Sequence, residues 1–325
     1  MNIAEFTQQM NAWGKDKVPF LFVIDFELQK PVIIRLSDVN PEEILFDING
    51  STNSQSFLPL SESTISINNA KPITLSAYRQ KFDIVFNHLT YGDSYLTNLT
   101  TSTPITLTSS LRDLYLKSKA RYKLFFRDEF LVFSPEIFVQ IRDGQIFSYP
   151  MKGTIDASLP DAQNKIIADQ KELAEHVTIV DLIRNDLSQV SADVTVKRFR
   201  YIDELKTNHK NLLQVSSEVT GKLPPDYGSH LGDIMVKLLP AGSISGAPKP
   251  KTIEIIQQAE GESRGYYTGV FGYFDGKVLD SGVMIRYIQR VGDQYFYRSG
   301  AGITTQSVVE TEYQETIDKV YVPFA

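Results

Sequence analysis

The chain has 325 residues, of which 42% are hydrophobic and 22% charged, a composition typical of globular proteins with one large domain or two. Its net charge of −6 provides no basic footprint for nucleic acid, and the absence of cysteine excludes disulfides, thiolate catalysis and cysteine-based zinc or iron–sulfur sites. The N-terminal segment has no apolar signal core, and no uncharged apolar run approaches the roughly 20 residues of a membrane span. We therefore expect a cytoplasmic protein that binds neither nucleic acid nor membrane.

The N-terminal half mixes short helices and strands. Apolar residues at helical spacing predict helices over residues 5–13, 74–90 and 109–118. Apolar runs and alternation predict strands over residues 19–28, over 31–36, in the GDSYLTNLT segment, and repeatedly between Tyr122 and Pro150. Residues 49–70 are rich in Ser, Thr and Asn, which favours turns and short strands. The Arg142-Asp143-Gly144 sequence is typical of a hairpin turn.

The C-terminal half continues without a regular alternation of strand and helix. Helices are predicted from about 160 to 184, ending in the DLIRND sequence, then over 228–238 and about 307–320. Strands are predicted around 193–202 and 212–221, and in the segments YTGVFGYFDG, VLDSGVMIRYIQR and DQYFYRSGAGIT. The irregular order predicts an α+β fold of layered antiparallel sheets with flanking helices, in one integrated domain over residues 1–325.

Residues 240–258, PAGSISGAPKPKTIEIIQQ, form a small-residue turn that leads into a helix. The unpaired N–H groups of such a turn, together with the positive end of the helix dipole, suit a phosphate or carboxylate. A tight structural connection explains the same pattern equally well. The segment is not a P-loop, because no Gly-Lys-Ser/Thr follows at the required spacing.

Two helices carry glutamates in pairs. Glu172 and Glu175 are three residues apart, and Glu312, Glu315 and Lys319 share one face of the last helix. Carboxylates from two helices could converge on Mg²⁺, which prefers oxygen ligands. Spacing alone does not separate a metal site from two solvated helix faces.

Other candidates lie in strands or at their ends. Glu136, within the apolar run VFSPEIFVQI, is either a desolvated general acid or a surface residue on an edge strand. Lys152 follows a strand and is an anion ligand, a nucleophile or a solvated loop residue. Arg286 ends an apolar strand, and residues 299–302 (SGAG) form a second small-residue turn that could offer backbone donors.

Taken together and in order, these motifs resemble the chorismate-utilising enzymes, which include anthranilate, aminodeoxychorismate, isochorismate and salicylate synthases. The matching segments are GDSYLTNLT, FSPEIF, PMKGT, KELAEHVTIVDLIRND, PAGSISGAPK, YYTGVFGYF, MIRY, SGAGI and ETEYQETIDK. The resemblance implies a fold like that of anthranilate synthase component I. It also implies a variable N-terminal part over residues 1–72 and a core with the catalytic motifs over 73–325.

The same resemblance implies roles for individual residues. Glu175 and Glu312 would bind Mg²⁺, with Glu172 and Glu315 as possible supporting carboxylates. Glu136 would protonate the departing C4 hydroxyl of chorismate. The substrate would be held by Thr154, Gln214, Ser243, Tyr267, Arg286, Gly300, Ala301, Gly302 and Lys319.

Lys152 separates the branches of the family. The P-x-K-G-T pattern resembles aminodeoxychorismate synthase, in which this lysine is thought to add at ring C2 before ammonia adds at C4. Leu96 stands where water-adding members place a lysine base, which counts against isochorismate and salicylate synthesis. Ala241, Val309 and Gln214 also depart from common family residues, and none of the three removes a group from the implied catalytic set.

The resemblance therefore implies Mg²⁺-dependent amination of chorismate at C4 with ammonia from a separate glutamine amidotransferase subunit. We expect no fused amidotransferase, because the sequence has no cysteine nucleophile. Two alternatives remain at this stage, which are anthranilate synthase component I and a catalytically silent subunit that binds chorismate or another anion. The intact set of Glu136, Lys152, Glu175 and Glu312 counts against silence.

Overall fold

The computed structural model describes residues 1–55, 57, 67–205 and 211–323. The helices of this part of the chain are α1 (Ile3–Lys15), α2 (Leu75–Tyr91), α3 (Leu111–Lys117), α4 (Ala162–Ala168), α5 (Gln170–Ser188), α6 (Leu231–Leu238), α7 (Gly242–Ser245), α8 (Lys249–Glu260) and α9 (Val309–Asp318). No helix in these residues is long and apolar enough to cross a membrane.

The strands of the N-terminal half are β1 (Phe20–Ile24), β2 (Val32–Arg35), β3 (Ile44–Ile48), β4 (Ser51–Thr52), β5 (Ile67–Asn68), β6 (Leu96–Leu107), β7 (Tyr122–Phe126), β8 (Phe130–Ser134), β9 (Ile137–Arg142), β10 (Gln145–Ser148) and β11 (Met151–Asp156). The remaining strands are β12 (Ala192–Leu205), β13 (Leu212–Lys222), β14 (Gly246–Ala247), β15 (Val270–Phe274), β16 (Leu279–Val283), β17 (Tyr287–Val291) and β18 (Gln294–Ile303).

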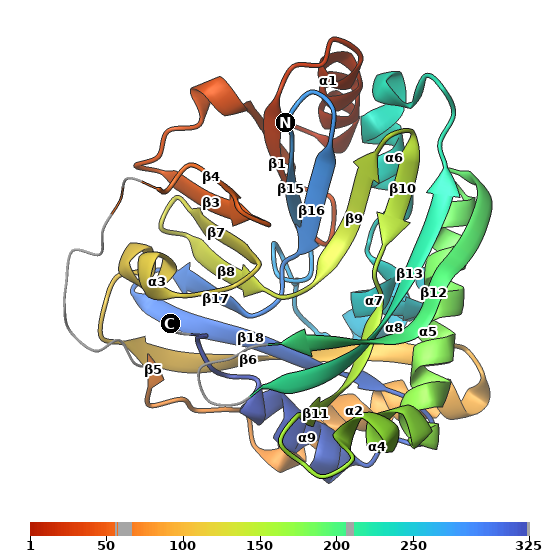
Figure 1. Ribbon diagram of the computed structural model, residues 1–325. Coiled ribbons are helices and arrows are strands. Elements are labelled where there is room, and N and C mark those ends of the chain that lie inside the picture. The colour runs from red at the N-terminus through yellow and green to blue at the C-terminus, as the bar shows by residue number, and fades with distance from the viewer. Residues whose placement is uncertain (56, 58–66, 206–210, 324–325) are drawn as a thin grey trace.

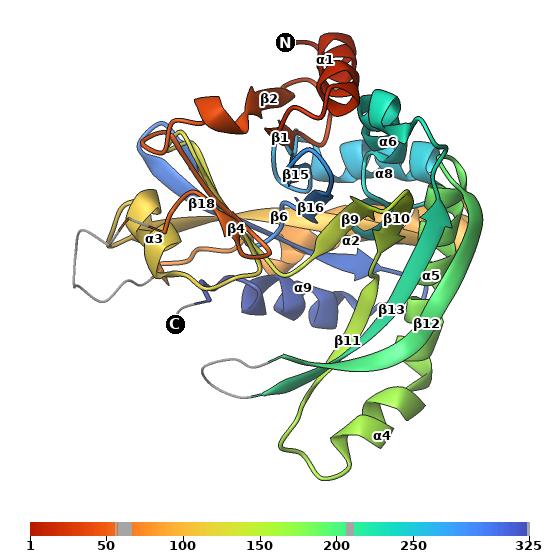
Figure 2. The ribbon, with the colours of Figure 1, turned by 45° about the horizontal axis from the view of Figure 1, so that its top comes forward.

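Two antiparallel sheets form the centre of the molecule (Figure 1). The first has the strand order β11-β13-β10-β9-β16-β15-β1-β2, with β12 also paired to β13. The second has the order β14-β6-β18-β17-β8-β7-β3-β4, with β5 paired to β6. Long strands β12 and β13, together with β11 and α4, extend away from the rest of the molecule as an arm (Figure 2). This architecture confirms the predicted α+β class with antiparallel sheets and flanking helices.

Helix α2 shows how local sequence produces the predicted elements. The Thr74 side chain accepts a hydrogen bond from Ala77 N at the start of the helix, and Gly92 ends it in the left-handed conformation at φ 96°. Tyr78, Phe82, Val85 and Leu89 recur at helical spacing and are all buried. They pack with residues of β6, β18, α8 and α9 in one apolar cluster, so α2 covers one face of the second sheet.

The chain crosses between the two sheets at two places that determine the site. Pro135 and Glu136 join β8 of the second sheet to β9 of the first, and residues 284–286 join β16 back to β17. The two crossings are hydrogen-bonded to each other, because Val283 N donates to Glu136 O at 3.1 Å and Phe133 N donates to Arg286 O at 3.1 Å. Glu136 and Arg286 are thereby brought together, although 150 residues separate them in the sequence.

Several local predictions are corrected by the structure. The helix expected over 160–184 is two helices, because Asp169 is extended at ψ 115° and its side chain caps α5 by accepting from Glu172 N. The apolar run around Glu136 is not one strand, because the chain changes sheets there. The predicted turn at residues 299–302 is instead the C-terminal part of β18, which pairs with β6 through this whole segment.

The small-residue segment that begins at Pro240 also differs from the prediction. It contains the four-residue helix α7 and the short strand β14 before the chain reaches α8 at Lys249, where a single turn was expected. The turns and short strands predicted for residues 49–70 fall partly outside the described residues, and β4 and β5 lie in the part that is described. The Asp143-Gly144 hairpin is confirmed, with both residues at positive φ between β9 and β10.

Candidate active site

A cavity of about 490 Å³ lies where the two sheets meet, and it is enclosed by α5, α7, α9, β11 and β18. The site residues predicted from the sequence line it with one exception: Glu136, Lys152, Thr154, Glu172, Glu175, Gln214, Ser243, Tyr267, Arg286, Gly300, Gly302, Glu312, Glu315 and Lys319. The exception is Ala301, whose side chain is buried in the apolar cluster on the opposite face of β18. Alternation along the strand separates it from the two neighbouring glycines.

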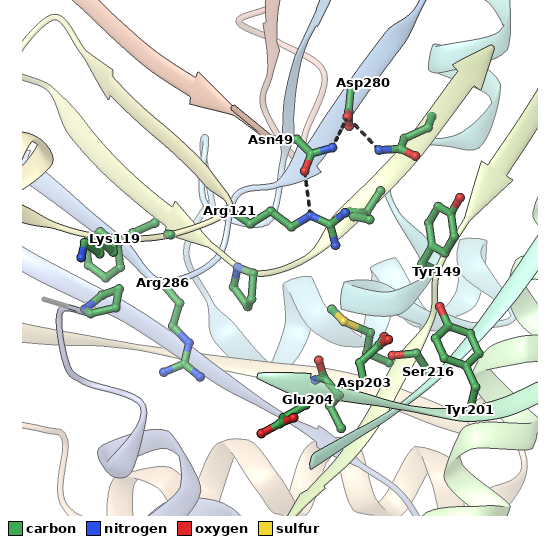
Figure 3. Close-up of a pocket in the computed structure, with 18 of the residues that line it drawn as sticks. Asn49, Lys119, Arg121, Tyr149, Tyr201, Asp203, Glu204, Ser216, Asp280 and Arg286 are labelled. Atoms are coloured by element: carbon green, nitrogen blue, oxygen red, sulfur yellow. Dashed lines mark hydrogen bonds between the residues drawn. The ribbon is translucent and has the colours of Figure 1, made fainter. Parts of the chain in front are cut away.

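A larger cavity of about 940 Å³ adjoins the first and shares Met151, Gln214 and Arg286 with it (Figure 3). Asp280 in its wall accepts hydrogen bonds from Asn49 at 3.1 Å and from Gln140 at 2.7 Å. Volume alone would favour the larger cavity as the active site. We assign the chemistry to the smaller one, because the candidate acid, the lysines and all four predicted glutamates line it.

Glu136 has the surroundings of a general acid. The Ser243 hydroxyl of α7 donates a hydrogen bond to its Oε1 at 2.5 Å. Burial raises the pKa of the Glu136 carboxyl, while Ser243, Lys152 and Lys319 oppose the shift without reversing it. A carboxyl with a raised pKa keeps its proton closer to neutral pH and can deliver it to a leaving group.

Lys152 projects from β11 at an irregularity in the strand. The register with β13 shifts between Met151 and Thr154, and Gly153 adopts φ 80°. Lys152 Nζ lies 3.2 Å from Glu175 Oε2. Burial lowers the pKa of Lys152, but the charge and hydrogen bond of Glu175, together with the charges of Glu315 and Glu172, outweigh burial, so the net direction of the pKa is upward. The lysine is therefore a protonated cation in the ligand-free protein.

Lys319, just after α9, differs from Lys152. Its Nζ donates to Gly300 O at 2.7 Å and lies 2.6 Å from Glu315 Oε1. Burial lowers the pKa of Lys319, and Glu315 opposes that shift only in part. The ammonium ties the end of α9 to the strand that forms the floor of the cavity.

The four glutamates come from two helices, as the sequence predicted. Glu172 and Glu175 belong to α5, and Glu312 and Glu315 to α9. Among the described residues, no three acidic, histidine or cysteine side chains are placed to hold a metal on their own. Mg²⁺ is commonly bound through only one or two carboxylates, with substrate oxygens and water as the other ligands. Oxygen donors on facing helices fit that mode of binding.

Arg286 and Tyr267 line the cavity near the sheet crossings. Arg286 adopts φ 53°, an unusual conformation for a bulky residue, and its guanidinium lies 4.5 Å from the ring centre of Tyr321. Burial raises the pKa of Tyr267 to about 12, so its phenol stays protonated and can donate a hydrogen bond. On the other wall, Thr154 of β11 is paired with Gln214 of β13.

Several residues that line the cavity were not among the predicted site residues, and Asn98, Leu96 and Arg298 are three of them. Asn98 of β6 is paired with Gly302, and its Oδ1 is buried without a hydrogen-bond partner among the described residues. Leu96, considered above only as a departure from the residues common in the family, lies close to Gly302. A Cβ atom added to this glycine would be 3.3 Å from Leu96 Cδ1. Arg298 of β18 shares a strand face with Gly300 and Gly302, and this alternation was readable in the segment RSGAG.

Solved structures of chorismate-using enzymes share this architecture. Anthranilate synthase component I from Streptococcus pneumoniae superimposes with a TM-score of 0.66 at 26% identity, over 82% of this chain and 60% of that one. The menaquinone-specific isochorismate synthase MenF from Escherichia coli superimposes with a TM-score of 0.74 over 97% of this chain and 80% of that one. Its 17% identity shows the fold alone.

The chain belongs to the family of chorismate-binding enzymes, whose sequence model matches residues 39–324. It is 50% identical over 319 residues to an uncharacterised PabA-like protein of Haemophilus influenzae, covering 98% of this chain and 96% of that one. It is 31% identical over 315 residues to aminodeoxychorismate synthase component 1 of Escherichia coli, covering 92% of this chain and 66% of that protein.

Proposed function

We propose that this protein is the synthase component of aminodeoxychorismate synthase, which replaces the C4 hydroxyl of chorismate with an amino group from ammonia. The product, 4-amino-4-deoxychorismate, keeps its enolpyruvyl group and leads to 4-aminobenzoate and folate. The observation that carries the proposal is the position of the Lys152 amine inside the cavity. A Cβ atom added to Gly302 would lie 3.6 Å from Lys152 Nζ, and Glu136 lines the same cavity. Similarity to aminodeoxychorismate synthase component 1 supports it.

The residues suit a two-stage substitution. The neutral amine of Lys152 bonds to C2, the ring double bonds shift, and the C4–O bond breaks as Glu136 supplies the proton that lets the hydroxyl leave as water. Ammonia then bonds to C4, the double bonds shift back, and the C2–N bond to Lys152 breaks. Hydroxide is a poor leaving group without protonation, so the raised pKa of Glu136 serves the first stage.

We further propose that Glu175 and Glu312 bind Mg²⁺ together with the substrate's ring carboxylate. The ion would supply positive charge against a dianionic substrate. Its charge would also oppose the effect of Glu175 on Lys152, since that carboxylate is the largest contribution that raises the pKa of the lysine. The ammonia is expected from a separate glutamine amidotransferase subunit, as the family resemblance implies, and the name of the Escherichia coli relative, component 1, is consistent with a second component.

The two glutamates make the metal proposal testable. Glu175→Ala and Glu312→Ala should each abolish Mg²⁺-dependent turnover and weaken Mg²⁺ binding measured by calorimetry, because each removes an oxygen ligand. Glu310→Ala is a matched control, since Glu310 lies on the same helix but is 56% exposed and paired with Arg79. Turnover close to wild type in either of the first two variants would contradict the assignment.

Product identity tests the proposed reaction against its rivals. Chorismate, Mg²⁺ and an ammonium salt are incubated with the protein, and the products are separated by chromatography. We expect 4-amino-4-deoxychorismate. Anthranilate would instead indicate anthranilate synthase component I, which adds ammonia at C2 and eliminates pyruvate. No turnover of chorismate would indicate a non-catalytic binding subunit.

A further inference from the structure

The segment that carries Ser243, the hydrogen-bond partner of Glu136, is a loop whose two ends are tied together. The chain leaves α6 after Leu238, passes through α7 and β14, and enters α8 at Lys249. Lys249 Nζ donates a hydrogen bond to Leu238 O at 2.7 Å. One ammonium group therefore joins the start of the loop to its end.

The same ammonium forms a buried ion pair with α5. Lys249 Nζ lies 2.8 Å from Asp186 Oδ2, and the two side chains are only 14% and 8% exposed. A Cβ atom added to Gly242 would lie 2.8 Å from the same Asp186 oxygen, so the start of α7 packs directly on the pair. Lys249 thus fixes the base of the loop, and Asp186 supports the helix inside it.

Stability alone does not account for this ion pair. Burial raises the pKa of Asp186 and lowers the pKa of Lys249, and each residue opposes the shift of the other only in part. Replacing a buried ion pair by apolar side chains of similar shape is often neutral or stabilising, so such a pair is weak evidence for stability. Its advantage in several proteins is that it specifies one arrangement of the groups around it.

The arrangement around this pair includes the contact between α7 and the acid. The Ser243 hydroxyl donates to Glu136 Oε1 at 2.5 Å, so a proton carried by the carboxyl is left on the other oxygen, Oε2. The next residue, Ile244, is held separately, because its carbonyl accepts a hydrogen bond from Arg264 Nη1 at 3.0 Å. Arg264 belongs to a buried core pair with Glu260, whereas the pair on α5 and α8 can be changed without touching that core.

We propose that Asp186 and Lys249 are positioning residues, which hold α7 so that Ser243 orients the carboxyl of Glu136. This inference rests on the proposed function only for the role of Glu136 as the acid. Neither Asp186 nor Lys249 lines the candidate active site. They are the last residues of the sequence motifs DLIRND and PAGSISGAPK, so the proposal also explains what these two segments contribute together.

Steady-state kinetics with chorismate test the path through the serine. Lys249→Met should lower kcat about 10- to 100-fold, the usual effect of losing a hydrogen bond to a charged group. It should leave KM within about threefold, because the substrate contacts remain. In a Ser243→Ala background, Lys249→Met should lower kcat no further, since both changes remove the same contact. Independent losses that multiply in the double variant, or wild-type kcat in Lys249→Met, would overturn the proposal.

A matched control lies two residues further along the same helix. Lys251 is 43% exposed and pairs with Glu254 at the surface of α8, so Lys251→Met should keep the wild-type kcat. The test variant is mild for the fold, because burial already raises the pKa of Asp186 and this carboxyl can take up a proton when its partner is lost.

The pKa of Glu136 is a readout that a general loss of stability would not move. Burial raises this pKa, and the hydrogen bond from Ser243 opposes the rise, as do the charges of Lys152 and Lys319. Loss of the serine contact should therefore raise the pKa further. Carbon NMR of glutamate-labelled protein can follow the titration, with the resonance assigned by its absence in Glu136→Gln. We expect a higher pKa in Lys249→Met and in Ser243→Ala, and no change in the control variant.

The NMR titration also separates this proposal from the proposed function. It needs no turnover, so its result would stand if the wild-type protein made anthranilate or left chorismate unchanged. An unchanged pKa of Glu136 in Lys249→Met would contradict the positioning role even if kcat fell.

An apolar replacement of the whole pair separates positioning from stability. Leucine has the branching of aspartate, so Asp186→Leu combined with Lys249→Met should keep a melting temperature close to that of the wild type. Its kcat should stay as low as that of Lys249→Met, because Leu238 O still lacks its ammonium donor. If Lys249→Met alone is too unstable to assay, this double variant decides the question. A wild-type kcat in the double variant would show that packing alone places α7, and the proposal would be wrong.

Discussion

Replacing Lys152 with alanine is expected to abolish synthesis of 4-amino-4-deoxychorismate, because the first bond to the ring would have no nucleophile. Removal of an attacking group typically costs about 10³-fold or more in rate. Slow direct addition of ammonia at C2, the chemistry of the anthranilate branch, could remain. Initial rates of chorismate consumption, with products separated by chromatography, measure both effects.

Lys152→Arg distinguishes a nucleophile from a charge. Arginine keeps the positive charge beside Glu175, but its guanidinium stays protonated and does not attack. We expect the arginine variant to lose amination at C4 as completely as the alanine variant. Substantial activity of Lys152→Arg would mean that the lysine acts only through its charge, and the choice between the two aminating branches would reopen.

Glu136→Gln should lower the rate about 10²- to 10⁴-fold, the usual contribution of general acid catalysis. Glutamine keeps the shape and can still contact Ser243, so the loss should appear mainly in kcat. Glu129→Gln is a suitable control, because Glu129 is exposed and immediately precedes β8, the strand that leads to Glu136. A Glu136→Gln variant within a few-fold of wild type would show that another group protonates the hydroxyl.

The pH dependence of the rate also tests whether Glu136 acts as the general acid. The acid works only when protonated, so the wild-type rate should fall as pH rises through the pKa of Glu136. Burial raises that pKa above the ordinary value of a glutamate, which moves the fall toward neutral pH. In Glu136→Gln this fall should disappear from the residual rate, whereas a purely structural role of Glu136 would leave the pH profile unchanged.

The elements predicted correctly from the sequence depend on local physics. The helical spacing of Tyr78, Phe82 and Leu89 predicted α2, and the Asp143-Gly144 pair predicted the β9–β10 hairpin. The break between α4 and α5 was also readable, because Asp169 followed three residues later by Glu172 is a helix-start pattern. Residues 299–302 were misread because small residues suit both a turn and a strand that a ligand approaches closely.

The arrangement of the site depends on contacts between segments that are distant in the sequence. The spacing of apolar residues along the chain does not reveal such contacts. Glu136 was read as part of one strand, because nothing local shows that β8 and β9 belong to different sheets. The raised pKa of Lys152 could not be predicted from the sequence, because its pairing with Glu175 joins β11 to α5 and is visible only in the fold.

The central claim is that Lys152 bonds covalently to the substrate, and mass spectrometry of the protein tests it most directly. The protein is incubated with chorismate and Mg²⁺ without ammonia, so that the second stage cannot release the lysine, and intact and peptide masses are then measured. The account predicts an increase equal to chorismate minus water on the peptide that contains Lys152, and no increase in Lys152→Ala. An unmodified Lys152 in a protein that makes 4-amino-4-deoxychorismate once ammonia is added would contradict it.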